Sequence, residues 1–191
     1  AVPSNKIEGI KALGAEVRLI GANQDEAQLE ADRLSIEEGM TYVSPFDNID
    51  VIAGQGTLGL EIYRQIPEVN FAFVPLSGGG LICGVAKALK QLNRNLKVIG
   101  VSMDRGAAMY ESQKVGKPIF VKEEESLADA LTGGIGLDNK YTFQLTKQLV
   151  DEIVVVSEKE IADGIHHAYW RESQIVEGAG AVAIASLLNK K

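Results

Sequence analysis

The hydrophobic pattern alternates between helical spacing and short continuous apolar runs. Helical spacing predicts helices at about residues 5–13, 23–39, 81–92, 104–115, 138–150, 157–174 and 178–188. Apolar runs, several of them rich in β-branched residues, predict strands at 17–20, 41–43, 71–75, 98–101 and 153–156. Strands that alternate with helices indicate an α/β fold built on a parallel sheet.

Local capping signals support two of these helices. Asn23 has Glu26 three residues further on, and Ser157 has Glu160 at the same spacing. This is the pattern of a capping box, in which the two side chains bond the free backbone N–H groups of the first turn. The domain boundary is expected near Pro45, with residues 1–44 in a smaller unit and residues 45–191 in a larger one.

The most informative stretch is Ser77-Gly78-Gly79-Gly80-Leu81, which joins the strand at 71–75 to the helix at 81–92. Three consecutive glycines cost ordering entropy and contribute no packing. They do expose backbone N–H groups that can converge on an anion, next to the positive end of a helix dipole. We therefore interpret this stretch as a phosphate-binding loop. A tight turn that happens to be rich in glycine is the alternative.

Two familiar phosphate motifs do not fit this loop. A nucleotide-binding P-loop needs a lysine after its last glycine, but Val85 follows Gly84. A dinucleotide fingerprint needs glycine at its sixth position, which is Cys83 here, although Asp104 lies where a ribose-binding carboxylate could be. A phosphate held mainly by backbone suits pyridoxal 5'-phosphate (PLP), whose ring carries the chemistry itself.

Two further glycine groups leave alternatives open. Gly54, Gly56 and Gly59 fall within a helical segment, where close packing on the sheet and contact with a ligand are equally good explanations. The cluster Thr132-Gly133-Gly134-Ile135-Gly136 follows no obvious strand. It is expected to be either a mobile loop or a backbone wall against a ligand.

Composition narrows the possible partners. The 191 residues are 46% hydrophobic and only 6% aromatic, and the net charge is −7. A negative chain without a basic block argues against a nucleic-acid partner. No apolar run is long enough to span a membrane, and no signal peptide is visible. The one cysteine, Cys83, excludes an internal disulfide, so a cytoplasmic location is the default expectation.

Several segments together resemble the fold type II PLP enzymes of the threonine/serine dehydratase and serine racemase family. The likeness rests on the loop Ser77–Leu81 after Phe73-Val74-Pro75, and on three more segments in the family's order, at residues 3–17, 45–57 and 176–181. Residues 101–109 and 126–139 look most like the dehydratases of hydroxyectoine utilisation. The resemblance implies a three-layer parallel sheet of the tryptophan synthase β-like kind, incomplete here because both ends of the chain look cut.

The resemblance also implies a reaction and a site. The reaction is a β-elimination of water from a hydroxy amino acid such as threonine or serine, giving a 2-oxo acid and ammonia. The loop would hold the phosphate of PLP, Gly133 and Gly134 would lie against the ring, and Glu177 would lie near it; the implied cofactor-binding set is Ser77, Gly78, Gly79, Gly80, Leu81, Gly134 and Glu177. A homodimer is expected on the same ground, and no membrane partner.

The sequence departs from the family pattern in two ways. The family's Schiff-base lysine lies upstream in a Ser-Phe-Lys type motif, and none of the thirteen lysines here matches it, so we expect no catalytic residue in this chain and no activity from it alone. Serine racemase-like members bind a divalent ion through acidic residues, and the corresponding positions here are Ser102, Gly106 and Ala108, which predict no metal site. Racemisation, β-replacement and a non-catalytic phosphate-ligand-binding module remain the alternative functions.

Overall fold

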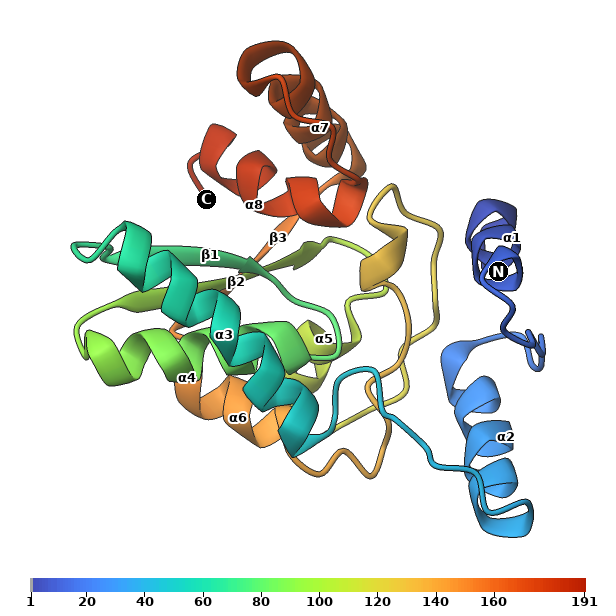
Figure 1. Ribbon diagram of the computed structural model, residues 1–191. Helices are drawn as coiled ribbons and strands as arrows, with labels where there is room; N and C mark the ends of the chain where they lie inside the picture. The colour runs from blue at the N-terminus through green and yellow to red at the C-terminus, as the bar shows by residue number, and fades with distance from the viewer. Residues whose placement is uncertain (1) are drawn as a thin grey trace. The chain divides into compact units, whose positions relative to one another are not determined.

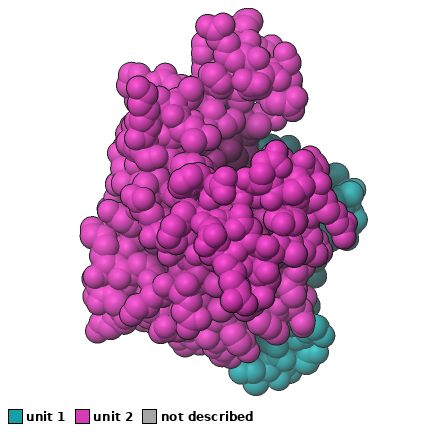
Figure 2. Space-filling model, turned by 90° about the vertical axis from the view of Figure 1, so that its left-hand side faces the viewer, with its two compact units in different colours: residues 1–42 teal, residues 43–191 magenta. Residues whose placement is uncertain are grey.

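The computed structural model describes residues 2–191, which form two compact units (Figures 1 and 2). The first unit ends at Tyr42 and the second runs from Val43 to Lys191. None of the helices in the described residues is long and apolar enough to cross a membrane.

The first unit contains the helices α1 (Ser4–Ala12) and α2 (Gln24–Glu37). Asn23 caps α2 by accepting the N–H of Glu26, as predicted, whereas the Glu26 carboxylate accepts the N–H of Ala22 rather than that of Asn23. The strands predicted at 17–20 and 41–43 are wrong. A strand needs a neighbour that shares its backbone hydrogen bonds, and no described residue pairs with these two segments.

The second unit is built on a parallel sheet of β1 (Phe71–Pro75), β2 (Lys97–Met103) and β3 (Glu152–Val156), in the order β1-β2-β3. The expected α/β class and parallel pairing are confirmed. The central strand β2 is buried from Val98 onward, while β1 lies at an edge, where Phe71 is 63% exposed. The strand predicted at 71–75 is confirmed, and within it only Val74 is buried.

Helices cover both faces of this sheet (Figure 1). One face carries α4 (Gly80–Leu92) and α6 (Thr142–Leu149), with α3 (Ile49–Gln65) packed on α4 and α5 (Ala108–Val115) beside α6. The other face carries α8 (Gly178–Leu188), with α7 (Glu158–Glu172) packed on it. The short 3-10 helix η1 (Asp129–Leu131) contacts α8. The helix expected from Asp104 begins four residues later, at Ala108.

Alternate residues of β2 point into two separate hydrophobic cores. Val98 packs with α4 and α6, and Ile99, Val101 and Met103 pack with α7 and α8. This division follows from the two-residue repeat of a strand. It accounts for the continuous apolar run of the sequence, since both faces of the central strand are covered.

Gly59 of α3 and Gly84 of α4 allow the two helices to pack closely. A Cβ on Gly59 would lie 2.8 Å from the carbonyl oxygen of Val85, and one on Gly84 would lie 2.7 Å from the amide nitrogen of Gly56. The backbones of α3 and α4 therefore approach closely at these residues. A Cβ on Gly54 would have no neighbour within 4 Å. Of the alternatives left open by the sequence, close packing explains Gly59, with a helix rather than the sheet as the neighbour, whereas a Cβ on Gly56 would meet nothing nearer than 3.4 Å.

Asp151 joins α4 to β2 and β3 at the amino edge of the sheet. Its carboxylate accepts bonds from Lys90 Nζ at 2.6 Å, Lys97 Nζ at 2.9 Å and the N–H of Val98 at 2.9 Å. Burial alone would raise the pKa of Asp151, but these donors outweigh burial and lower the pKa to about 2. The charged form therefore stabilises the fold above the unfolded-state pKa near 3.8, and this contribution is lost as the pH falls from there toward 2.

The change Asp151→Asn is expected to lower the free energy of unfolding by about 1–2 kcal/mol at pH 7, because it removes the charge that the two lysines share. Urea unfolding at pH 7 and at pH 3 measures this. The difference between the variant and the natural protein should narrow at pH 3, where Asp151 is mostly protonated in the unfolded chain. Glu152→Gln, at the neighbouring exposed position, is the control and should change stability little at either pH.

Candidate functional site

The carboxyl ends of the three parallel strands lie along one edge of the sheet, and the glycine loop is one of the connections at that edge. Residues 77–79 follow β1 and lead into α4, residues 104–107 follow β2, and Ser157 follows β3. The segment 126–128 is bonded to Glu158, at the start of α7. In open α/β sheets, this edge is where ligands bind.

The glycine loop presents a run of free backbone donors. From Ser77 through Ile82, no N–H group has an acceptor among the described residues, and the first helical bond of α4 is donated by Cys83 to the carbonyl of Gly79. Gly78, Gly79 and Gly80 are nevertheless buried. Buried N–H groups without a partner are rare in folded proteins. A run of six at a helix N-terminus is a donor set suited to an anion such as a phosphate group.

The same three positions have no space for a side chain. A Cβ on Gly78 would lie 2.4 Å from the ring of Phe46, and one on Gly80 would lie 2.9 Å from the Cα of Phe46. Gly79 has a φ of +94°, and a Cβ there would lie 3.0 Å from the Cβ of Thr142. Phe46 leaves no room for a Cβ at Gly78 and Gly80, and the positive φ of Gly79 favours glycine at that position.

Helix α6 supports the loop from behind. The Sγ of Cys83 lies 3.6 Å from the carbonyl oxygen of Thr142 and 3.5 Å from the Oγ1 of Thr146. Burial raises the pKa of the Cys83 thiol to about 11, although the contact with Thr146 acts in the opposite direction. A thiol with this pKa is protonated at neutral pH and is a poor nucleophile. Cys83 is therefore a packing residue of the site.

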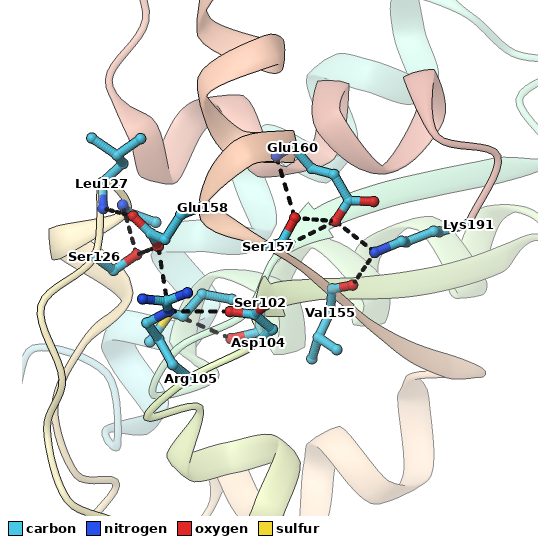
Figure 3. Close-up of polar contacts among 12 residues, drawn as sticks. Ser102, Asp104, Arg105, Ser126, Leu127, Val155, Ser157, Glu158, Glu160 and Lys191 are labelled. Carbon is cyan, nitrogen blue, oxygen red and sulfur yellow. Dashed lines mark hydrogen bonds and ion pairs between the residues drawn. The ribbon is translucent and has the colours of Figure 1, made fainter.

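A second group of contacts fastens the segment 126–128 at the same edge (Figure 3). The carboxylate of Glu158 accepts the hydroxyl of Ser126 at 2.6 Å and the N–H of Leu127 at 2.8 Å, and it lies 3.9 Å from the Nε of Arg105. Beside it, Ser157 and Glu160 form the predicted capping box of α7, and Lys191 bonds Glu160. The first turn of α7 thereby holds the segment that leads into η1 and the second glycine cluster.

The remaining predicted site residues are Gly133, Gly134 and Glu177. The second cluster, at residues 132–136, lies just after η1, with Gly133 at φ +111° and Gly136 at φ +76°. Glu177 is exposed and precedes α8, and a Cβ on Gly178 would lie 1.9 Å from the carbonyl oxygen of Leu127. Gly178, which follows Glu177 in the chain, therefore lies against the backbone of the 126–128 segment.

Three contributors to the site carry no local sequence signal. Phe46 contacts the glycine loop, Asp47 binds the start of α6, and Glu158 holds the segment 126–128. Each acts on residues more than thirty positions away in the chain. One indirect signal exists for Asp47, because Tyr141, directly before α6, has no side-chain cap and cannot supply one of the usual kind.

Side chains of the usual metal-ligating kinds are not clustered in the described part of the chain. Among residues 2–191, no three His, Cys, Asp or Glu side chains are grouped so that they could hold a metal ion. At the positions where acidic ligands would be needed, Ser102 and Ala108 are buried and Gly106 has a φ of +59°. His166 and His167 lie on α7, where His167 contacts Glu172.

The donor set and the shape of the loop fit the phosphate of PLP. The loop offers uncharged N–H groups at the start of a 13-residue helix. Its three glycines carry no Cβ atoms that would fill the space around these groups. The fold and this loop define an α/β protein with a glycine-rich loop of free N–H donors at the carboxyl edge of a parallel sheet.

Comparison with known proteins gives the family. Residues 1–191 match the family described as pyridoxal-phosphate dependent enzyme, and the chain belongs to that family. It is 55% identical over 190 residues to a putative threonine dehydratase of Sinorhizobium fredii, covering 100% of this chain and 57% of the relative. It is 43% identical over 188 residues to an L-threonine ammonia-lyase of Thermotoga maritima, covering 98% and 46%.

Solved structures agree with this result. The fold superposes on maize serine racemase with a TM-score of 0.88 at 31% identity, covering 97% of this chain and 56% of that one. The predicted membership of the threonine dehydratase and serine racemase group is confirmed. The chain spans about half the length of the curated relatives named above.

Proposed function

We propose that the protein containing this chain is a PLP-dependent dehydratase that converts L-threonine or L-serine into a 2-oxo acid and ammonia. The single observation that carries this proposal is the run of free N–H groups from Ser77 through Ile82 at the buried glycine loop. The names of the two relatives above support threonine as the substrate.

In this proposal Ser77, Gly78, Gly79, Gly80 and Leu81 hold the phosphate of PLP through their backbone N–H groups. Gly133 and Gly134 lie against the ring, because glycines leave backbone there without side chains, and Glu177 lies nearby. When bound, PLP supplies an electron sink for the charge left on the α-carbon after proton removal. The lysine that attaches the cofactor is expected outside these 191 residues.

The net reaction is balanced without a co-substrate. Elimination releases the β-hydroxyl group as water, and hydrolysis of the resulting product takes up one water and releases ammonia. Each molecule of threonine therefore gives one molecule of 2-oxo acid and one of ammonia.

Purified gene product of natural length, supplied with PLP, should release 2-oxo acid and ammonia in equal amounts from L-threonine. Chiral analysis of the residual amino acid tests the second candidate, a racemase, which the similarity to maize serine racemase favours. A racemase would give the D-amino acid without ammonia. A β-replacement enzyme would give a product only with an added nucleophile. A protein that binds PLP but changes no amino acid would contradict the proposal.

The narrower parts of the resemblance are proposed on the same basis. The likeness of residues 101–109 and 126–139 to dehydratases of hydroxyectoine utilisation adds a hydroxy amino acid from that breakdown to the substrates to be assayed. We also propose a homodimer in the cytoplasm, which size-exclusion chromatography and cell fractionation would test.

A further inference from the structure

We propose that Phe46 and Asp47 are positioning residues that hold the glycine loop in its phosphate-binding shape, a role that rests on the function proposed above. Neither residue lies on the loop, on β1 or on α4. Both precede α3, shortly after the second unit begins at Val43.

Phe46 covers one side of the loop. Its ring atoms lie 2.4–2.7 Å from the position that a Cβ of Gly78 would occupy, and its Cα, Cβ and carbonyl oxygen lie 2.9–3.1 Å from that of Gly80. These separations mean that Phe46 packs directly on bare glycine backbone. An aromatic side chain there excludes water from one side of the loop, which strengthens the attraction between the free N–H groups and an anion.

Asp47 fixes the element on the other side. Its Oδ1 accepts the N–H groups of Tyr141 and Thr142 at 2.9 Å each, and its Oδ2 accepts that of Lys140 at 2.6 Å. These are free donors at the start of α6, 93 to 95 residues away in the chain. Asp47 therefore caps α6 from a distance, and its negative charge lies at the positive end of the helix dipole.

The first turns of α6 then contact the loop and the helix that follows it. Thr142 and Thr146 lie 3.0 Å and 3.1 Å from the Cβ position of Gly79. The same two residues contact the thiol of Cys83, one turn into α4. Phe46 therefore contacts the loop, the loop and α4 contact α6, and α6 is bonded to Asp47, the residue next to Phe46.

The loop needs such support because it has few bonds of its own. Its N–H groups from Ser77 onward bond nothing in the described residues, and three glycines in a row are the most flexible backbone available. A flexible loop would lose entropy on binding phosphate, whereas a loop held in advance does not. The contacts of Phe46 with the loop and of Asp47 with α6 hold the loop in advance in this way.

The test compares two ligands in the gene product of natural length: PLP, and pyridoxal, which lacks the phosphate. Their dissociation constants are measured for the natural protein, for Asp47→Asn and for the control Asp50→Asn, which changes an exposed carboxylate three residues away. Asp47→Asn keeps the side-chain shape but places an NH₂ group against one of the three N–H donors. We expect it to weaken PLP about tenfold and pyridoxal less than twofold, and Asp50→Asn to change neither.

The outcomes separate this inference from the function on which it rests. If the natural protein binds PLP no better than pyridoxal, the loop does not bind phosphate and the proposed function fails. If the natural protein prefers PLP and Asp47→Asn keeps that preference, or weakens both ligands equally, the positioning role is wrong. If Asp47→Asn does not fold, Phe46→Leu decides by the same ratio: a reduced preference for PLP supports the inference, and an unchanged preference overturns it.

Discussion

Replacing Gly79 with alanine is expected to lower the affinity of the protein for PLP by about 100-fold. Alanine at φ +94° is strained by about 1–2 kcal/mol. Its Cβ would also lie 3.0–3.1 Å from atoms of Thr142, Met109 and Thr146, and crowding of this kind costs about 1–3 kcal/mol. The loop would escape the strain by changing shape, and binding would have to reverse that change. A combined cost of about 3 kcal/mol corresponds to about 100-fold in affinity.

Gly116→Ala is the matched control for the backbone strain. Gly116 has a φ of +85° at the end of α5, and a Cβ there would have no neighbour within 4 Å. Both variants should lose stability in thermal unfolding, but only Gly79→Ala should lose affinity in a titration with PLP. Equal affinity in the Gly79→Ala protein and the natural protein would mean that the loop is only a turn between β1 and α4.

The sequence was sufficient for the elements whose signals are local. The parallel strands β1 to β3, the capping box at Ser157 and the glycine loop each follow from a few adjacent residues, because hydrophobic period, cap chemistry and glycine content act over one or two turns of chain. Strands were wrongly predicted at 17–20 and 41–43 for the complementary reason. An apolar run becomes a strand only with a partner, and a run by itself does not specify one.

The support of the site could not be predicted, because it depends on contacts between distant segments. The sequence indicated that residues 77–81 bind an anion, and it treated the three glycines as bare backbone for a ligand. In the structure, Gly78 and Gly80 are required by Phe46, and Gly79 by Thr142 and its own φ. Packing around the loop is thus a reason for the glycine content, and only the three-dimensional contacts reveal it.

The segment 126–128 shows the same dependence on distant contacts, and it leads to the second large expected effect. The carbonyl of Leu127 lies against Gly178 at the start of α8, while the N–H of the same residue is bonded to Glu158. The segment is therefore held between α8 and α7. It cannot move away from α8 without breaking its bonds to Glu158, and it leads directly into η1 and the second glycine cluster.

Gly178→Ala is accordingly expected to lower the free energy of unfolding by about 3–4 kcal/mol and to weaken PLP binding. The added Cβ would lie 1.9 Å from the carbonyl oxygen of Leu127 and 2.9 Å from the nitrogen of Ala128, which are backbone atoms that cannot rotate away. Gly180→Ala, two residues further along α8, is the control, since its Cβ would approach only Val176, at 3.8 Å. Because alanine favours a helix over glycine by up to about 1 kcal/mol, this control should be as stable as the natural protein or more stable. Urea unfolding measures both variants, and a Gly178→Ala protein as stable as the Gly180→Ala protein would show that α8 does not pack on the 126–128 segment as described.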